Sequence, residues 1–261
     1  MKAIKHKHSA RNRNVITSIG STNKKKALHS VSIQQLKGEQ PTLWLDAQIV
    51  RTTPSTAQDV FPARVGTPPG SSGALRPVWT DRGLLFGGSQ SSFKAADGSD
   101  TAGYNAITIV VVSKQDLPLT DGTLIDTYNP YWYAGNAALQ SAAATGEMYY
   151  GLGNGGGPVD GLLGITGPGP NGKKLSSACR YDRTLAGDAM IYSKNGFQGE
   201  ITTNIASTYN PTFNSNALFV GSRGAVSVFF QGLIKMIFIL PHNLTQQEVD
   251  GFSRMCFWGS N

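Results

Sequence analysis

The sequence predicts an all-β fold, a sandwich of short antiparallel strands with one C-terminal helix and a basic N-terminal arm. The 261 residues include 31 Gly and 13 Pro, which are both poor in helix interiors. Hydrophobic residues make up 39% and charged residues 15%, a composition that argues against a disordered chain. Short apolar segments recur at intervals of about ten residues with turn residues between them, which is typical of β-sandwiches and barrels.

Charge divides the chain into two predicted parts. Residues 1–38 contain nine Lys or Arg and no acid, whereas residues 39–261 contain the other 14 bases and all 16 acids. The net charge of +7 is therefore the sum of a +9 extended arm and a −2 body that we expect to form the sandwich. The candidate anchor residues of the arm are Lys2, Lys5, Lys7, Arg11, Arg13, Lys24, Lys25, Lys26, Val31 and Ile33.

The arm has three alternative roles. Val31 and Ile33 alternate with polar residues and are suited to adding a strand to the open sheet edge of a protein partner. Its cations are also suited to nonspecific nucleic-acid contact, because they neutralise phosphates without a base-reading element. The third alternative is a solvated tail.

The start of the chain and the length of its apolar runs favour cytoplasmic synthesis. No apolar segment follows the basic start, so we expect no secretory signal. The longest apolar runs, Ile107–Val112 and Met236–Leu240, are too short to span a bilayer, so we expect no membrane partner. In a reducing compartment Cys179 and Cys256 are expected to be free and buried.

The strands are expected in the following order. Leu43, Leu45 and Ala47 alternate and predict the first strand, and the Pro- and Gly-rich residues 52–76 predict a long surface loop. Further strands are expected near Leu84–Phe86, Ala106–Ser113, Gly122–Asp126, Glu147–Leu152, Leu162–Thr166, Leu175–Tyr181, Ala189–Ser193, Phe197–Thr203, Ala217–Gly221 and Val226–Leu240.

Two local signals are stronger than the rest. Asn195-Gly196 tolerates the positive φ angles of a type I′ turn and predicts a hairpin between its flanking strands. Thr245 and Glu248 fit a capping box. Val249, Phe252 and Cys256 then share one face of the predicted C-terminal helix, which we expect to pack on the rim of the sandwich.

Seven segments in order carry a family resemblance. The chain over residues 41–259 resembles concanavalin A-like jelly-roll domains of the laminin G type, as found in tailed-bacteriophage structural proteins. The resemblance implies two antiparallel sheets packed face to face, with Leu244–Trp258 beside the first strand. The segments are Leu43–Ala47 (LWLDA), Arg76-Pro77 with Leu84–Gly88, Ile107–Val112, Asp188–Gly196, Leu218–Arg223, Gly232–Leu240 with Leu244–Glu248, and Phe257–Gly259.

This resemblance, together with the arm, leads to a structural hypothesis. The chain would be a virion protein made in the host cytoplasm, a head decoration or tail-associated protein anchored through its arm. Its partners would be other virion proteins and copies of itself. A carbohydrate-binding, lectin-like module is the alternative, and the two roles are compatible.

The residues argue against catalysis. Hydrolases of this fold class place Glu, Asp and Glu at alternate positions on one strand face, where two carboxyl groups do the chemistry. None of the four glutamates, Glu39, Glu147, Glu200 and Glu248, has that spacing. His242, the one histidine after residue 38, lies in a predicted turn. We therefore expect no enzyme activity and no cofactor.

Binding residues are easier to nominate. Exposed Tyr and Trp rings stack on sugar faces, although the same residues also fill cores and protein interfaces. The glycan or interface candidates are Tyr128, Tyr131, Trp132, Tyr133, Tyr149 and Tyr150. Some relatives bind calcium, and the carboxylates available for it are Asp97, Asp100, Asp121 and Asp126, which lack the spacing of an EF-hand loop.

Overall fold

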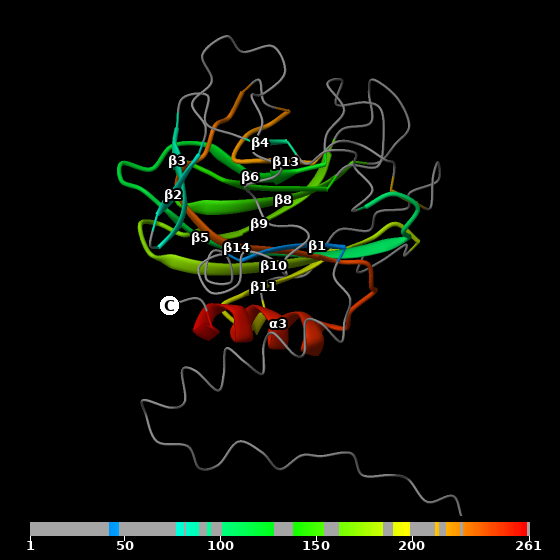
Figure 1. The fold of residues 1–261 in the computed structure, drawn as a ribbon. Helices are drawn as coiled ribbons and strands as arrows, with labels where there is room; N and C mark the ends of the chain where they lie inside the picture. Colours follow the sequence, from blue (N-terminus) through cyan, green and yellow to red (C-terminus); the bar gives the residue numbers. More distant parts are fainter. Residues whose placement is uncertain are drawn as a thin grey trace, which may run out of the picture.

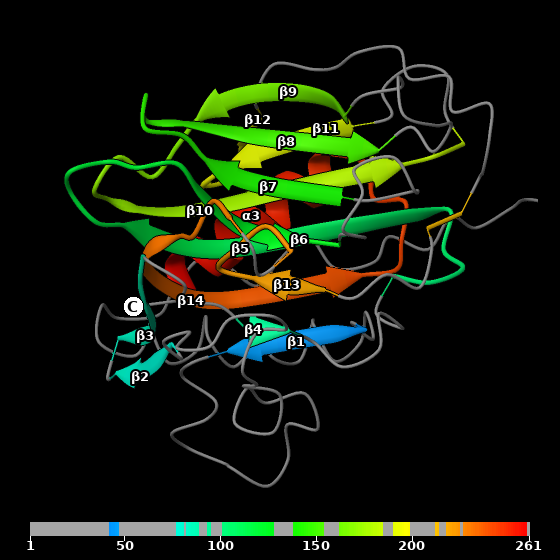
Figure 2. The same cartoon turned by 90° about the horizontal axis from the view of Figure 1, so that it is seen from above.

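The fold is an antiparallel β-sandwich of the jelly-roll type with one helix on its outside (Figures 1 and 2). The computed structural model describes residues 42–46, 77–80, 82–88, 93–94, 101–127, 138–153, 162–184, 190–198, 212–213, 218–224 and 227–259. Figure 1 shows the two sheets edge-on as stacked layers, with helix α3 (Gln246–Gly259) beneath the lower sheet. The arm and residues 52–76 lie outside the described residues.

The larger sheet has eight strands. Seven of these strands follow the order β12-β11-β10-β5-β14-β3-β2. The eighth, β1, also pairs with β14. The long strands β10, β5 and β14 are adjacent and form the centre. The bounds are β1 Leu43–Asp46, β2 Val78–Thr80, β3 Gly83–Gly87, β5 Ala106–Gln115, β10 Lys174–Asp182, β11 Met190–Lys194, β12 Phe197–Gln198 and β14 Gln231–Leu240.

The smaller sheet has six strands in the order β4-β13-β6-β7-β8-β9, and Figure 2 shows it from above. All ladders in both sheets are antiparallel. The bounds are β4 Phe93–Lys94, β6 Gly122–Asp126, β7 Ala138–Ala142, β8 Glu147–Gly153, β9 Leu162–Pro168 and β13 Phe219–Val220.

The expected strands are present, with two kinds of difference. The strand expected over Val226–Leu240 begins only at Gln231, because Val228 adopts a positive φ of 50° that extended backbone does not allow. Strands β2, β4 and β7 were not expected. Strand β7 is rich in Ala, which has a low β propensity, and it is held by pairing with β6 and β8 on its two sides.

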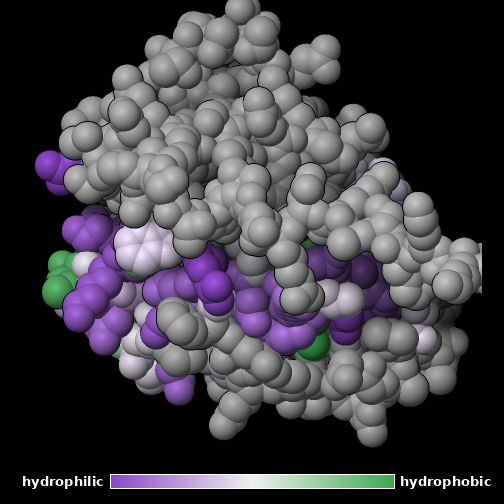
Figure 3. Space-filling model, turned by 90° about the horizontal axis from the view of Figure 1, so that it is seen from below, coloured by the Kyte–Doolittle hydropathy of each residue, from purple (hydrophilic) through white to green (hydrophobic). Residues whose placement is uncertain are grey.

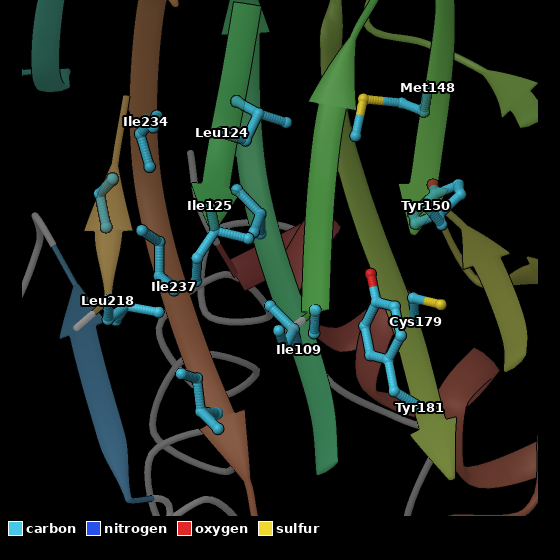
Figure 4. Packing of buried hydrophobic residues seen from close by; sticks show 14 of the residues in the cluster. Ile109, Leu124, Ile125, Met148, Tyr150, Cys179, Tyr181, Leu218, Ile234 and Ile237 are labelled. Atoms are coloured by element: carbon cyan, nitrogen blue, oxygen red, sulfur yellow. The ribbon is translucent and has the colours of Figure 1, made fainter. Parts of the chain in front are cut away.

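The hydrophobic core has two layers. The first fills the space between the sheets, where residues such as Ile109, Leu124 and Ile237 point toward one another (Figure 4). The second lies between the outer face of the larger sheet and α3, and it includes Val110 and Phe252. Strand β5 is thus buried on both faces, which explains its nearly continuous apolar run, interrupted by Thr108 between Ala106 and Val112.

Helix α3 begins as expected but packs elsewhere. The Glu248 carboxylate accepts hydrogen bonds from the backbone N–H and the hydroxyl of Thr245, at 2.8 and 2.9 Å. The buried face of the helix lies over β10 and β11 on the outer face of the larger sheet. The expected position on the sandwich rim is therefore wrong. The expected place beside the first strand is wrong as well, because the main contacts of α3 are with β10 and β11 and not with β1.

Two smaller predictions are confirmed. Asn195 and Gly196 have φ angles of 54° and 86° and join β11 to β12 in a hairpin. Cys179 and Cys256 are free and buried, the first between the sheets and the second on the buried face of α3. Within the described part of the chain, no helix is long and apolar enough to cross a membrane.

Candidate functional site

The outer face of the six-stranded sheet presents one of the nominated aromatic residues. Met148, Tyr150 and Leu152 on β8 are buried in the core between the sheets. Because successive side chains of a strand point to opposite faces, Tyr149 lies on the outer face, where it is half-buried. Burial raises the pKa of Tyr149 above its ordinary value of 10.0, so the phenol is neutral at physiological pH.

Polar groups flank Tyr149 on the same face. Glu147, two residues earlier on β8, is exposed, and its carboxylate accepts a hydrogen bond from the Thr145 hydroxyl at 3.1 Å. Ser141 on β7 lies directly opposite Tyr149, and its hydroxyl donates to the Gly122 carbonyl at 3.1 Å. An aromatic ring, a solvent-exposed carboxylate and a hydroxyl thus share one surface.

The aromatic segment of the sequence connects β6 to β7 of the same sheet. Thr127 follows β6 and Ala138 begins β7. The Thr127 N–H donates to the Ala138 carbonyl at 3.1 Å, and the Ala138 N–H donates to the Thr127 hydroxyl at 2.8 Å. This reciprocal pair closes the ends of the intervening segment, whose own residues Tyr128, Tyr131, Trp132 and Tyr133 lie outside the described residues.

Tyr150 belongs to the core and not to a surface. Its ring is fully buried and stacks on Tyr192, with ring centroids 4.9 Å apart (Figure 4 shows Tyr150 beside Cys179 and Tyr181). Its hydroxyl lies 2.9 Å from the Ser177 hydroxyl, which donates to the Gln140 side chain at 3.0 Å. Burial, the largest cause, raises the pKa of Tyr150 strongly. The core alternative is therefore the correct one for this residue.

The structure separates the two described carboxylates that were considered for calcium. Asp121 and Asp126 lie at opposite ends of β6. Asp121 is exposed and accepts a hydrogen bond from the Ala144 N–H at 2.8 Å, whereas Asp126 is buried near Arg223 and Gly224. Asp97 and Asp100 lie outside the described residues. Among those residues that are described, no three His, Cys, Asp or Glu side chains group to hold a metal.

The remaining site predictions are not tested. All the arm residues nominated as anchors lie outside the described part of the chain, so the arm's partner stays a prediction. Glu147 and Ser141 were not predicted to be binding residues. The alternation of side chains along a strand could have indicated Glu147, because it places Glu147 and Tyr149 on one face of β8.

Comparison with known proteins gives no family assignment. No family model matches. No curated protein sequence matches. Several solved structures are similar in fold, at low sequence identity.

One is the CBM40 module of the Ruminococcus gnavus IT-sialidase, with 12% identity, a TM-score of 0.46, and 66% of this chain and 97% of that chain covered. The same module bound to α2,3-sialyllactose matches at 14% identity and a TM-score of 0.44, over 57% of this chain and 83% of that one. The receptor-binding domain of botulinum neurotoxin D matches at 12% identity and a TM-score of 0.49, over 73% of this chain and 46% of that one.

Proposed function

We propose that this chain is a carbohydrate-binding protein that holds neutral sugar residues on the outer face of its six-stranded sheet. The observation that carries the proposal is the juxtaposition of Tyr149 and Glu147 on that face. Residues two apart on a strand lie about 7 Å from each other, which is the size of one sugar ring.

The two side chains supply complementary chemistry. A half-exposed tyrosine ring offers an apolar face to the C–H groups of a sugar and keeps a polar tip for its hydroxyls. The Glu147 carboxylate is an acceptor with several lone-pair sites, which suits the hydroxyl donors of the same sugar. Because that carboxylate repels anions, we expect neutral sugars to be preferred over sialylated ones.

The aromatic connection between β6 and β7 extends the proposal. Its closed ends at Thr127 and Ala138 lie next to Leu152, which pairs with Ala138 and is three residues from Tyr149. That separation is about 10 Å along the strand, within the reach of an oligosaccharide of two or three units. We propose that Trp132 and its neighbouring tyrosines contact the further units.

The proposed role is binding without catalysis. The chain lacks the alternating Glu-Asp-Glu pattern that glycoside hydrolysis of this fold class uses. A place in a virion, anchored by the arm, remains compatible with the proposal.

A glycan array probed with the full chain tests the proposal. We expect hits among neutral oligosaccharides, lost on Tyr149→Ala and weakened on Glu147→Gln. The matched control is Trp258→Ala, which removes an exposed aromatic ring from the other side of the sandwich and should leave the hits unchanged. An array without hits, or hits that survive Tyr149→Ala, would contradict the proposal.

A further inference from the structure

Strand β9 is the longest strand at a sheet edge in the described part of the chain. It pairs with β8 over seven residues, and no described strand lies on its other side. The other edge strands are short, since β2 has three residues and β4 and β12 have two each. Strand β1, which pairs with β14, has four. The outer edge of β9 is therefore the longest row of backbone N–H and C=O groups on which another strand could pair.

Strand β9 lacks the features that usually block pairing at an edge. Such features are charged side chains, a proline within the strand, and bulges. The strand has the sequence LLGITGP, with no charged residue and with its proline at the last position. Its register with β8 runs without a shift, whereas the β6–β7 and β14–β5 ladders each contain one. This edge is suited to the addition of a strand from elsewhere.

The opposite surface of the sandwich is a weaker candidate for contact between chains. Seen from the side of α3, the described surface is mostly hydrophilic (Figure 3). Such a surface offers less apolar area for a partner to cover than a sheet edge that continues the core. We therefore consider what would fit the edge of β9.

The register of β9 defines the pattern that an added strand needs. Tyr150 of β8 pairs with Ile165, and the buried Tyr150 ring stacks on Tyr192 of β11. Strand β9 thus lies one strand further out, on the side of β12 (Figure 2). A strand added outside β9 would have alternate positions toward the larger sheet, where apolar side chains fit, and the others toward solvent.

The basic arm contains a segment with this pattern. In Val31–Leu36, the apolar residues Val31 and Ile33 alternate with Ser32 and Gln34. Val and Ile are β-branched and favour strands. The arm has a net charge of +9 and residues 39–261 have a net charge of −2, so the arm of one copy is attracted to the body of another.

The arm of the same copy is too short to reach this edge. The Thr42 N–H donates to the Ile239 carbonyl at 2.9 Å, which places the end of the arm beside β14. Five strand spacings, about 24 Å, separate β1 from β12 in the larger sheet, and β9 lies on that far side (Figure 2). Leu36 lies six positions before Thr42, and a chain of that length spans at most about 22 Å. A strand from the arm on β9 therefore comes from a second copy.

We propose that Val31–Leu36 of one copy adds as a strand to the β9 edge of a second copy. Backbone hydrogen bonds then supply affinity, while Val31 and Ile33, on the side of the larger sheet, select the register. Reciprocal exchange of arms between two copies closes a two-fold dimer in which each copy covers the other's edge.

Sedimentation equilibrium of the full chain tests this inference. We expect the wild type to be a dimer at micromolar concentration. The double variant Val31→Lys/Ile33→Lys places two charges on the side of the larger sheet and should raise the dimer Kd by about tenfold or more. The matched control, Ser32→Lys/Gln34→Lys, adds the same charges on the solvent side and should change the Kd by less than about threefold. Thermal unfolding of each variant verifies that it is folded.

A disulfide cross-link tests the position of the arm directly. One copy carries Ile33→Cys, and a second carries a single cysteine at one position from 163 to 166. Cys179 and Cys256 are buried, so they stay out of the reaction. After mixing and oxidation, we expect a disulfide between the two copies at every second position of β9. The inference is overturned if the wild type is a monomer, if Val31→Lys/Ile33→Lys leaves the dimer intact, or if no cysteine on β9 bonds to the arm.

Discussion

Asp126 shows how a single buried group links the fold to pH. It ends β6, it is 3% exposed, and its Oδ2 has no hydrogen-bond partner. Burial raises its pKa well above 3.8, while the Arg223 charge and a backbone hydrogen bond from Gly224 act in the opposite direction. Burial is the largest of these causes, so the folded chain favours the neutral form of this carboxyl more than the unfolded chain does.

We predict that stability falls as pH rises through this group's titration. The folded chain holds the Asp126 proton more tightly than the unfolded chain, so its contribution is complete below about pH 3.8 and is lost as pH rises through the raised folded pKa. Asp126→Asn should remove that loss and be more stable than the wild type near neutral pH. Urea unfolding at pH 4, 5.5 and 7 measures this, with exposed Asp121→Asn as the control. An Asn variant less stable than the wild type at pH 7 would show that Asp126 is ionised.

At the scale of elements, the sequence specified the long strands better than the short ones and better than the helix position. Strands β5 and β14 are long apolar runs, and β11–β12 is marked by Asn195-Gly196. Strand β7 was not predicted because its residues have a low intrinsic preference for strands, and it is stabilised by pairing with β6 and β8. Part of the position of α3 could be predicted, because a nearly continuous apolar run such as that of β5 indicates that a strand is buried on both faces.

Two glycines allow the same substitution with opposite expected results. A Cβ on Gly221, where φ is +80°, would lie 2.1 Å from the buried Phe86 ring. Gly221→Ala should lower the free energy of unfolding by about 2–5 kcal/mol, through backbone strain and overpacking.

Gly251 lies in α3, and a Cβ there meets nothing within 4 Å. Gly251→Ala should therefore raise the free energy of unfolding by about 0.5–1 kcal/mol. Chemical denaturation measures both, and a neutral Gly221→Ala would contradict the packing described between β13 and β3.

At the scale of the whole molecule, function depends on which residues share a face. The sequence revealed the division of charge between arm and body, yet the pairing of Lys114 with Lys174 became visible only when β5 and β10 were placed side by side. Of the nominated aromatic residues, Tyr149 and Tyr150 are adjacent in sequence and lie on opposite faces of β8. The alternation of side chains along a strand predicts that they point to opposite faces. Only the packing of the second sheet against β8 shows that Tyr150 is the one that faces the core.

The most direct test of the account is a calorimetric titration of the tightest neutral glycan against three forms of the full chain. We predict that Tyr149→Ala raises the Kd by about tenfold or more, through the lost stacking surface, while Trp258→Ala leaves it within about twofold of the wild type. Equal Kd values for Tyr149→Ala and the wild type would contradict a glycan site on the outer face of the six-stranded sheet.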